Sequence, residues 1–322
     1  MRSNRGEVTG IDPAKMAKLV TESRAEGTLS SYGASLRRVW QFGLQIDRLV
    51  FSWSEGELSA FLEKMAEQGL AEGSVKQGLA VVNMIFEAMG KVSPSKSVLV
   101  GHVKKALAKK ASRGKMRPRT LMTLGHLVTL VKCLYKKPAG LVPPVEKRCL
   151  LLQVLMFLGM KRFSDIRSVR VEDIKFRASG AVEISLGKTK TDQEGRGSSF
   201  IVAGDSKRGI VAADVLRWYL YSLCLRGRDY VFPSMRGGSI LKRKAVSYSA
   251  ALSSLRCVCE KLNLPKLTMH SARIGACTAG AKAGVSREYL KACGSWSSSA
   301  VDGYVRLRDP GLVFNKAIFR NS

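Results

Sequence analysis

The stretch AVEISLGKTKTDQEGRGSSFIV, residues 181–202, differs in its apolar pattern from the chain on either side. Val182, Ile184 and Leu186 alternate with polar residues, and Phe200 and Val202 repeat the alternation after a polar, glycine-containing segment at 191–197. A period of two is typical of a half-buried strand. The pattern therefore predicts a β-hairpin with a long tip, and with it a small antiparallel sheet.

Outside this stretch, apolar residues recur at helical spacing. Before residue 104 they form three groups, within 32–39, 58–65 and 75–89. Ser54, with Glu57 three residues later, predicts a capping box, and Ser74 is expected to cap the third helix. Further helices are expected around 127–134, 150–158, 215–223, 248–262 and 272–283. The predicted fold is mainly α with a small antiparallel sheet.

Residues 104–119, KKALAKKASRGKMRPR, contain many basic side chains, no acidic one, and two helix breakers, Gly114 and Pro118. We interpret this segment as a basic linker; the alternative is a solvated helix end. It would join a helical domain at 28–103 to a second domain at 120–322. Residues 1–27 would form an N-terminal tail, and the apolar C-terminus would form a tail helix that docks on a protein surface.

The chain of 322 residues has 54 Lys and Arg against 25 Asp and Glu, a net charge of +29, and most of the surplus follows residue 112. Such an excess favours a polyanionic partner. Seven Cys and three His are scattered without the spacing of a metal site, so we expect no metal and a reducing intracellular compartment. No apolar run reaches the ~20 residues of a membrane-spanning helix, and we expect no membrane partner.

Several enzyme classes lose their usual sequence signals. The chain contains no phosphate-binding loop of the Walker type, no dinucleotide fingerprint, and no motif of zinc proteases or serine hydrolases. A two-metal nuclease needs clustered carboxylates, whereas the acidic residues of the second domain are dispersed among basic ones. Catalysis by cationic side chains on a phosphate remains as the best-supported chemistry.

Four segments occur in this order: GMKRFSDIRSVRVEDI (159–174), GKTKT (187–191), HSAR (270–273) and GSWSSSAVDGYVR (294–306). Together they resemble the tyrosine recombinase, or phage integrase, family. The family pattern is Arg, Lys, His-x-x-Arg, His or Trp, and Tyr. The resemblance implies these site residues: Arg162, Lys190, His270, Arg273, Trp296 and Tyr304, with Asp165 in support. The spacing of eight residues from Trp296 to Tyr304 is one shorter than usual, and similar endings occur in recombinases of eukaryotic mobile elements.

The residue types also suit this chemistry on their own terms. Guanidinium groups such as those of Arg162 and Arg273 hold phosphate oxygens in a fixed, bidentate geometry. Asp165, at i+3 from Arg162, would orient it or form an ordinary helix salt bridge. His270 would bind phosphate or handle a proton, and Ser271 is expected to cap the helix that follows. The alternative for each is a surface charge or a structural role.

Lys190, at the start of the hairpin tip, would protonate the departing 5′-oxygen, with Lys188 as a competitor on the same side of the strand. Trp296 would donate one indole hydrogen bond or serve as a core residue. Tyr304 would be the nucleophile that forms a phosphotyrosine. Tyr289 is a rival, but it precedes Trp296 and breaks the family order.

The resemblance implies a two-domain, C-shaped clamp around DNA, in which a core-binding domain faces a catalytic domain. It implies a site-specific recombinase that uses a 3′-phosphotyrosine and no cofactor. Partners would be double-stranded DNA with inverted or paired sites and, through the C-terminal tail, a homotetramer; tail docking on its own domain is the alternative. The compartment would be a nucleus or a bacterial cytoplasm and nucleoid. Expected DNA contacts are Lys109, Lys110, Arg113, Lys115, Arg117, Arg119 and Lys188.

Two other functions fit part of the pattern. A type IB topoisomerase uses similar groups but rejoins the same DNA ends. A non-catalytic regulator would use residues 283–306 as a helix-turn-helix with its turn at Gly284. The second function leaves the segments around Arg162, Lys190 and His270 without a shared role.

Overall fold

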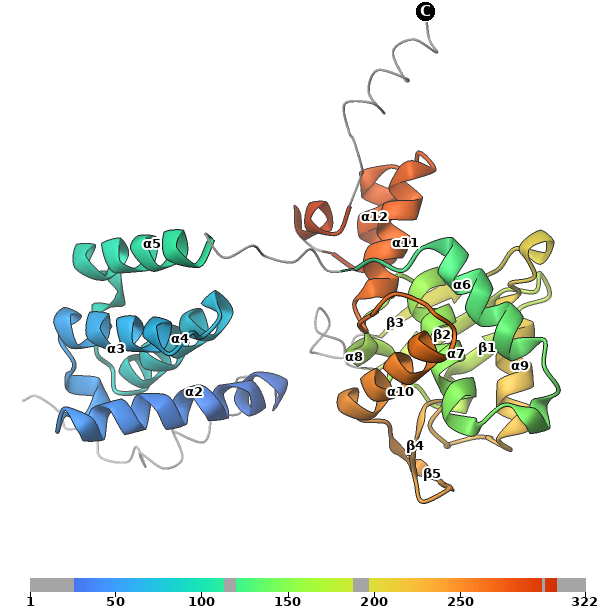
Figure 1. The fold of residues 1–322 in the computed structure, drawn as a ribbon, viewed down its shortest axis with the longest axis horizontal. Coiled ribbons are helices and arrows are strands. Elements are labelled where there is room, and N and C mark those ends of the chain that lie inside the picture. Colours follow the sequence, from blue (N-terminus) through green and yellow to red (C-terminus); the bar gives the residue numbers. More distant parts are fainter. Residues whose placement is uncertain (1–25, 113–119, 188–196, 297–298, 306–322) are drawn as a thin grey trace, which may run out of the picture. The chain divides into compact units, whose positions relative to one another are not determined.

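The computed structural model of the chain describes residues 26–112, 120–187, 197–296 and 299–305. The chain divides into two compact units, one ending at Arg117 and the other beginning at Pro118, and each is described by itself (Figure 1). Both units are predominantly helical, and the strands among the described residues all belong to the second unit. The predicted fold class, mainly α with small antiparallel sheets, is confirmed.

The first unit packs its helices around an aromatic centre. Phe42, Trp53 and Phe61 contact one another with ring centroids 5.2–5.4 Å apart. Apolar side chains at helical spacing converge on these rings because a helix buries one stripe of its surface. The three predicted helical groups are thereby confirmed. The helices are α2 (Glu26–Gln45), α3 (Glu55–Glu67), α4 (Glu72–Ala88) and α5 (Val98–Ser112), with 3₁₀ turns at Val50–Ser52 and Pro94–Lys96.

One of the two N-caps predicted in the first unit is present. The Ser54 backbone N–H donates to Glu57 Oε2 at 2.7 Å, and the Glu57 N–H donates to Ser54 Oγ at 3.3 Å, which completes the capping box of α3. The prediction that Ser74 caps α4 is wrong. That helix begins at Glu72 with Ala71 as its N-cap, so Ser74 lies inside the first turn, where its N–H donates to the Ala71 carbonyl.

The predicted linker at 104–119 starts too early. Helix α5 runs to Ser112, so residues 104–112 are the end of a helix, as in the alternative interpretation. The physical reason is that Val103 and Leu107 continue the apolar stripe begun by the fully buried Val100 and pack against the core of the first unit. Residues 113–119 lie outside the described chain.

The second unit is built around one helix that is buried on all sides. Helix α7 packs against α6, α8, α9, α10 and α11, and its residues from Lys147 to Phe157 are all buried. A helix that is apolar around its whole circumference belongs in the middle of a domain. The helices of this unit are α6 (Leu124–Leu130), α7 (Pro144–Leu158), α8 (Phe163–Ile166), α9 (Ala212–Ser222), α10 (Tyr248–Lys261), α11 (Ser271–Lys282) and α12 (Arg287–Gly294). Shorter helical turns lie at Val131–Tyr135, Ala139–Leu141, Val171–Asp173, Ser206–Arg208 and Ser299–Gly303.

The predicted hairpin is confirmed and is part of a three-stranded antiparallel sheet. Strands β2 (Val182–Leu186) and β3 (Ser198–Val202) pair with Ile184 opposite Phe200, and β1 (Ile174–Phe176) adds to the other edge of β2. The tip at 188–196 lies outside the described residues. A second hairpin, β4 (Pro233–Arg236) with β5 (Ser239–Ala245), was not expected from the sequence. Its strand β5 is polar and exposed, so it lacks the buried face that produces alternation.

Helix α11 approaches its neighbours closely, as its small residues suggest. A Cβ on Gly275 would lie 1.7 Å from the Met122 carbonyl oxygen, so only glycine fits there. The prediction that Ser271 caps this helix is wrong, because the N-cap position falls on His270. Ser271 Oγ instead accepts the Thr268 N–H at 2.9 Å and donates to the Thr120 carbonyl at 2.6 Å. This joins the start of α11 to the beginning of the second unit.

Candidate active site

Five of the predicted site residues lie together at the start of α11. Arg162 precedes α8, His270 and Arg273 begin α11, Trp296 follows α12, and Tyr304 follows the turn at Ser299–Gly303. Figure 1 shows α11 and α12 next to one another. The site is therefore assembled from segments that are far apart in sequence.

Arg273 is the centre of this cluster and is fully buried. Its Nη1 donates to the Met160 carbonyl at 2.5 Å and its Nη2 donates to the Gly294 carbonyl at 2.7 Å. Its guanidinium carbon lies 4.0 Å from the centroid of the Trp296 ring and 5.3 Å from that of Tyr304. Burial, and then the charge of Arg162, lower the pKa of Arg273 to about 10, so it stays charged at neutral pH.

Arg162 and Asp165 form a supporting pair. Asp165 Oδ2 accepts the Arg162 backbone N–H at 3.1 Å and lies 3.6 Å from Arg162 Nη1. The Asp165 side chain is 4% exposed and that of Arg162 is 18% exposed, so the pair is largely shielded from water. The Asp165 carboxylate thus accepts a backbone N–H at the start of α8 and also forms an ion pair with the Arg162 side chain. The two interpretations of Asp165, orienting residue and helix salt bridge, describe the same contact.

Tyr304 lies beside Trp296. The two ring centroids are 4.9 Å apart, and the centroid of the His270 ring is 6.2 Å from that of Tyr304. The Tyr304 carbonyl accepts a hydrogen bond from Thr278 Oγ1 of α11 at 3.2 Å, and its N–H donates to the Val301 carbonyl at 2.9 Å. The shortened spacing therefore leaves the Tyr304 ring against the Arg273 and Trp296 side chains.

Three buried N–H donors of the cluster have no hydrogen-bond partner within the described chain. They are Arg162 Nη1, whose ion pair with Asp165 at 3.6 Å is too long for a hydrogen bond, Arg273 Nε and Trp296 Nε1. Leaving one buried donor unpaired costs about 1–3 kcal/mol, and folded proteins rarely retain several in one place. All three groups donate hydrogen bonds, and two of them belong to cations. Such groups bind oxyanions such as phosphate. The geometry of the cluster is therefore suited to binding a phosphate.

The remaining predicted residues are not part of the cluster as the structure describes it. Lys188 and Lys190 lie outside the described residues, as do Arg113, Lys115, Arg117 and Arg119. Lys109 and Lys110 are exposed in the last turn of α5. The rival Tyr289 is 70% exposed on α12.

Lys161 was not predicted as a site residue. This side chain is 4% exposed, and its Nζ donates to the Cys293 carbonyl and to Ser295 Oγ, both at 2.9 Å. Burial, followed by the charge of Arg273, lowers the pKa of Lys161. In a chain this basic, one lysine beside Arg162 has no sequence signal of its own.

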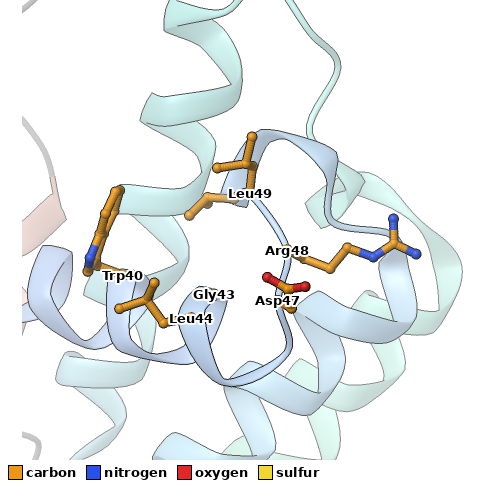
Figure 2. A pocket seen from close by; sticks show the side chains of 7 residues that line it. Trp40, Gly43, Leu44, Asp47, Arg48 and Leu49 are labelled. Carbon is orange, nitrogen blue, oxygen red and sulfur yellow. The ribbon is translucent and has the colours of Figure 1, made fainter.

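Other possible sites carry less chemistry. Within the described chain, no three His, Cys, Asp or Glu residues lie close enough to hold a metal ion, and no helix there is long and apolar enough to cross a membrane. The first unit has an apolar hollow of about 120 Å³ beside α2, where Trp40 and Leu44 are mostly exposed (Figure 2). Its lining consists of Trp40, Gly43, Leu44, Asp47, Arg48, Leu49 and Val50. It contains none of the candidate site residues.

Comparison with known proteins identifies relatives of this chain. No family model matches it. It is 25% identical over 298 residues to the recombinase Cre of Escherichia phage P1, covering 85% of this chain and 82% of that protein.

Solved structures resemble it over nearly its whole length. The XerH site-specific recombinase on a palindromic difH substrate has a TM-score of 0.64 and 14% identity, covering 97% of this chain and 86% of that one. The Tn1549 transposon integrase with right-end DNA has a TM-score of 0.61 and 13% identity, covering 96% and 99%. A lambda integrase dimer on a core site has a TM-score of 0.59 and 17% identity, covering 92% and 76%. The chain is therefore similar in sequence to the recombinase Cre and has the fold of these recombinases and integrases.

Proposed function

We propose that the protein is a site-specific DNA recombinase that cuts and rejoins DNA strands through a covalent 3′-phosphotyrosine intermediate. The observation that carries the proposal is the cluster of Arg162, Arg273 and Trp296, in which three buried N–H donors make no hydrogen bond within the described chain, packed against the ring of Tyr304. Cre, the relative in sequence, is a recombinase by name, and the three structures compared above contain DNA.

In this proposal Tyr304 is the nucleophile. Its hydroxyl oxygen attacks the scissile phosphorus, the bond from phosphorus to the 5′-oxygen breaks, and the 3′-phosphate becomes esterified to the tyrosine. The phenolic proton leaves to a base, for which we propose His270, whose ring centroid lies 6.2 Å from that of Tyr304. The departing 5′-oxygen takes up a proton from Lys190, and attack by another strand's 5′-hydroxyl reverses the steps. Because one ester replaces another, no nucleotide is needed.

The two arginines and Trp296 would stabilise the charge that builds on the non-bridging oxygens during attack. Arg273 is suited to this role because two backbone carbonyls hold its guanidinium in place before substrate arrives. Such preorganised donors act without a reorganisation cost in the transition state, and the loss of one typically lowers a rate by about 10²–10³-fold.

DNA binding would depend on the basic surface outside this cluster. Lys109 and Lys110 at the end of α5 would contact backbone phosphates together with Arg113, Lys115, Arg117, Arg119 and Lys188. Neutralising several phosphates releases counterions, so affinity should fall steeply as salt rises. A protein acting in this way works where DNA is held, in a nucleus or a bacterial nucleoid.

We further propose assembly on paired sites as a homotetramer. Lambda integrase has been solved as a tetramer on a Holliday junction. In the present chain, a shallow groove of about 460 Å³ is lined in part by Val305, the last residue that the structure describes. Its lining is mainly apolar: Ala281, Val285, Arg287, Leu290, Val301, Asp302 and Val305. A neighbouring copy's tail, with Leu312, Phe314 and Phe319, is the occupant we propose.

A nicked suicide duplex tests the nucleophile. Cleavage close to the nick releases a short fragment that carries the 5′-hydroxyl, and its loss prevents rejoining and traps the covalent adduct. Duplexes tiled across the DNA that flanks the gene would supply the target site. The expected result is a protein–DNA adduct that Tyr304→Phe abolishes and the matched variant Tyr289→Phe retains. An adduct that persists in Tyr304→Phe would exclude this tyrosine. Relaxation of plasmids by monomers without paired sites would favour the topoisomerase instead.

A further inference from the structure

Two buried cations cap the C-terminal end of α12. This helix ends at Gly294, and Ser295 adopts a left-handed backbone with φ of 54°. The Gly294 carbonyl accepts from Arg273 Nη2 at 2.7 Å, and the Cys293 carbonyl accepts from Lys161 Nζ at 2.9 Å. The last carbonyls of a helix lack partners within it and carry its negative dipole end, so cations are favoured there.

The burial of Lys161 needs an explanation. A lysine is almost never fully buried unless it is paired. Burial, and then the charge of Arg273, lower the pKa of Lys161, while the charge of Asp165 raises it. Its ammonium finds compensation from two oxygen acceptors on the α12 terminus, at Cys293 and Ser295, and from the face of the Phe200 ring at 5.3 Å. One side chain therefore joins the segment before α8, strand β3 and the end of α12.

The end of α12 determines where the Trp296 ring lies. Trp296 directly follows Ser295, and the Trp296 backbone N–H donates to the Lys291 carbonyl at 3.0 Å. Its indole then contacts Arg273 on one side and Tyr304 at a centroid distance of 4.9 Å. A shift of the α12 terminus would move the indole, and with it the surface against which the Tyr304 ring packs.

We propose that Lys161 is a positioning residue for strand cleavage, whose ammonium caps the end of α12 and thereby holds Trp296 against Arg273 and Tyr304. The proposal rests on the proposed recombinase function and deepens it. Lys161 acts through Trp296, not on the phosphate, because both of its oxygen acceptors belong to the turn that leads into the indole.

The test replaces Lys161 by methionine in the full chain, which keeps the length of the side chain and removes the ammonium. The chain offers a matched control in Lys147→Met. Lys147 is 5% exposed, its Nζ lies 5.7 Å from the Trp218 ring centroid, and burial lowers its pKa. Both variants thus remove a buried ammonium that faces an aromatic ring, but only Lys161 contacts the α12 terminus.

Adduct formation at saturating DNA is the first measurement. Small misplacements of a reacting group can cost up to about 10²-fold, so we expect Lys161→Met to be slower by about 10- to 100-fold, and Lys147→Met to stay within about threefold of wild type. In a Trp296→Phe background, Lys161→Met should add less than about threefold, because the two residues act as one unit. Independent, multiplicative effects of the two substitutions would overturn the proposal, as would a wild-type rate for Lys161→Met.

Acrylamide quenching of Trp296 fluorescence, obtained by subtracting the matching Trp296→Phe protein, is the second measurement and needs no DNA. We expect the indole to become more accessible in Lys161→Met and unchanged in Lys147→Met. Should Lys161→Met not fold, Ser295→Ala removes one acceptor and should raise quenching by a smaller amount; unchanged quenching would refute the proposal. If no adduct forms even with wild type, the recombinase function fails, while quenching still reports on Lys161.

Discussion

Replacing Gly294 by alanine tests how tightly the Trp296 ring is held. A Cβ at position 294 would lie 1.9, 2.2 and 2.6 Å from three atoms of the indole ring, far inside van der Waals contact. The ring cannot simply turn aside, because Arg273 covers one part of it and Tyr304 packs beside it. The alanine methyl must therefore displace Trp296 or push the end of α12 away.

The magnitude follows from the packing. Forcing an extra methyl group into a well-packed interior costs about 1–3 kcal/mol. For a unit of about 200 residues, each kcal/mol lowers the melting temperature by about 2–4 °C, so we expect a decrease of about 2–12 °C. Displacement of Trp296 also removes one preorganised donor, and the cleavage rate should fall by about 10²-fold or more.

Thermal unfolding followed by circular dichroism and adduct formation on a nicked duplex are the two assays. Gly125→Ala is the matched control in the same unit. Gly125 is exposed in the first turn of α6, and its added Cβ would meet only Thr123 Oγ1 at an ordinary 3.6 Å. Alanine there should leave the cleavage rate unchanged and add up to about 1 kcal/mol of stability. A Gly294→Ala protein with the melting temperature and rate of wild type would refute the reasoning about Trp296.

Three further outcomes are expected. Gly275→Ala should destabilise the second unit by about 3 kcal/mol or more in urea titrations, because its Cβ would overlap the backbone carbonyl of Met122; a wild-type midpoint would contradict the close approach of α11. Arg273→Lys should slow adduct formation by about 10²-fold while DNA affinity changes little, since an ammonium keeps the charge but cannot reproduce the two-armed hold on backbone carbonyls; single-turnover cleavage and fluorescence anisotropy separate the two. The hydrogen bond from the Ser54 backbone N–H lowers the pKa of Glu57, so this carboxylate stabilises the first unit above its unfolded pKa and loses that contribution as pH falls through the lower folded value. Glu57→Gln should therefore reduce stability at pH 7, and its difference from wild type should shrink as the solution is acidified below about pH 4; a difference independent of pH would exclude the carboxylate as its source.

Local patterns in the sequence were sufficient for most of the secondary structure. The alternation of Val182, Ile184 and Leu186 produced the predicted hairpin because a strand exposes and buries side chains in turn. The capping box of Ser54 and Glu57 formed as predicted because its two hydrogen bonds join residues only three apart. The prediction failed at Ser74 and Ser271, where the N-cap lies at another residue, and at residues 104–112, where the helix continues because its apolar stripe packs against the core of the first unit.

The sequence by itself determined most of the helical segments and the first hairpin, the strong positive charge, and the order of the candidate site residues, because all of these are properties of positions along the chain. Only the tertiary structure decided that Arg162, Arg273, Trp296 and Tyr304 share one site, since they come from four separate segments and meet only when these pack around α7 and α11. The same holds for Lys161. Its two acceptors lie more than 130 positions further along the chain, and no local pattern can report a contact that folding alone creates.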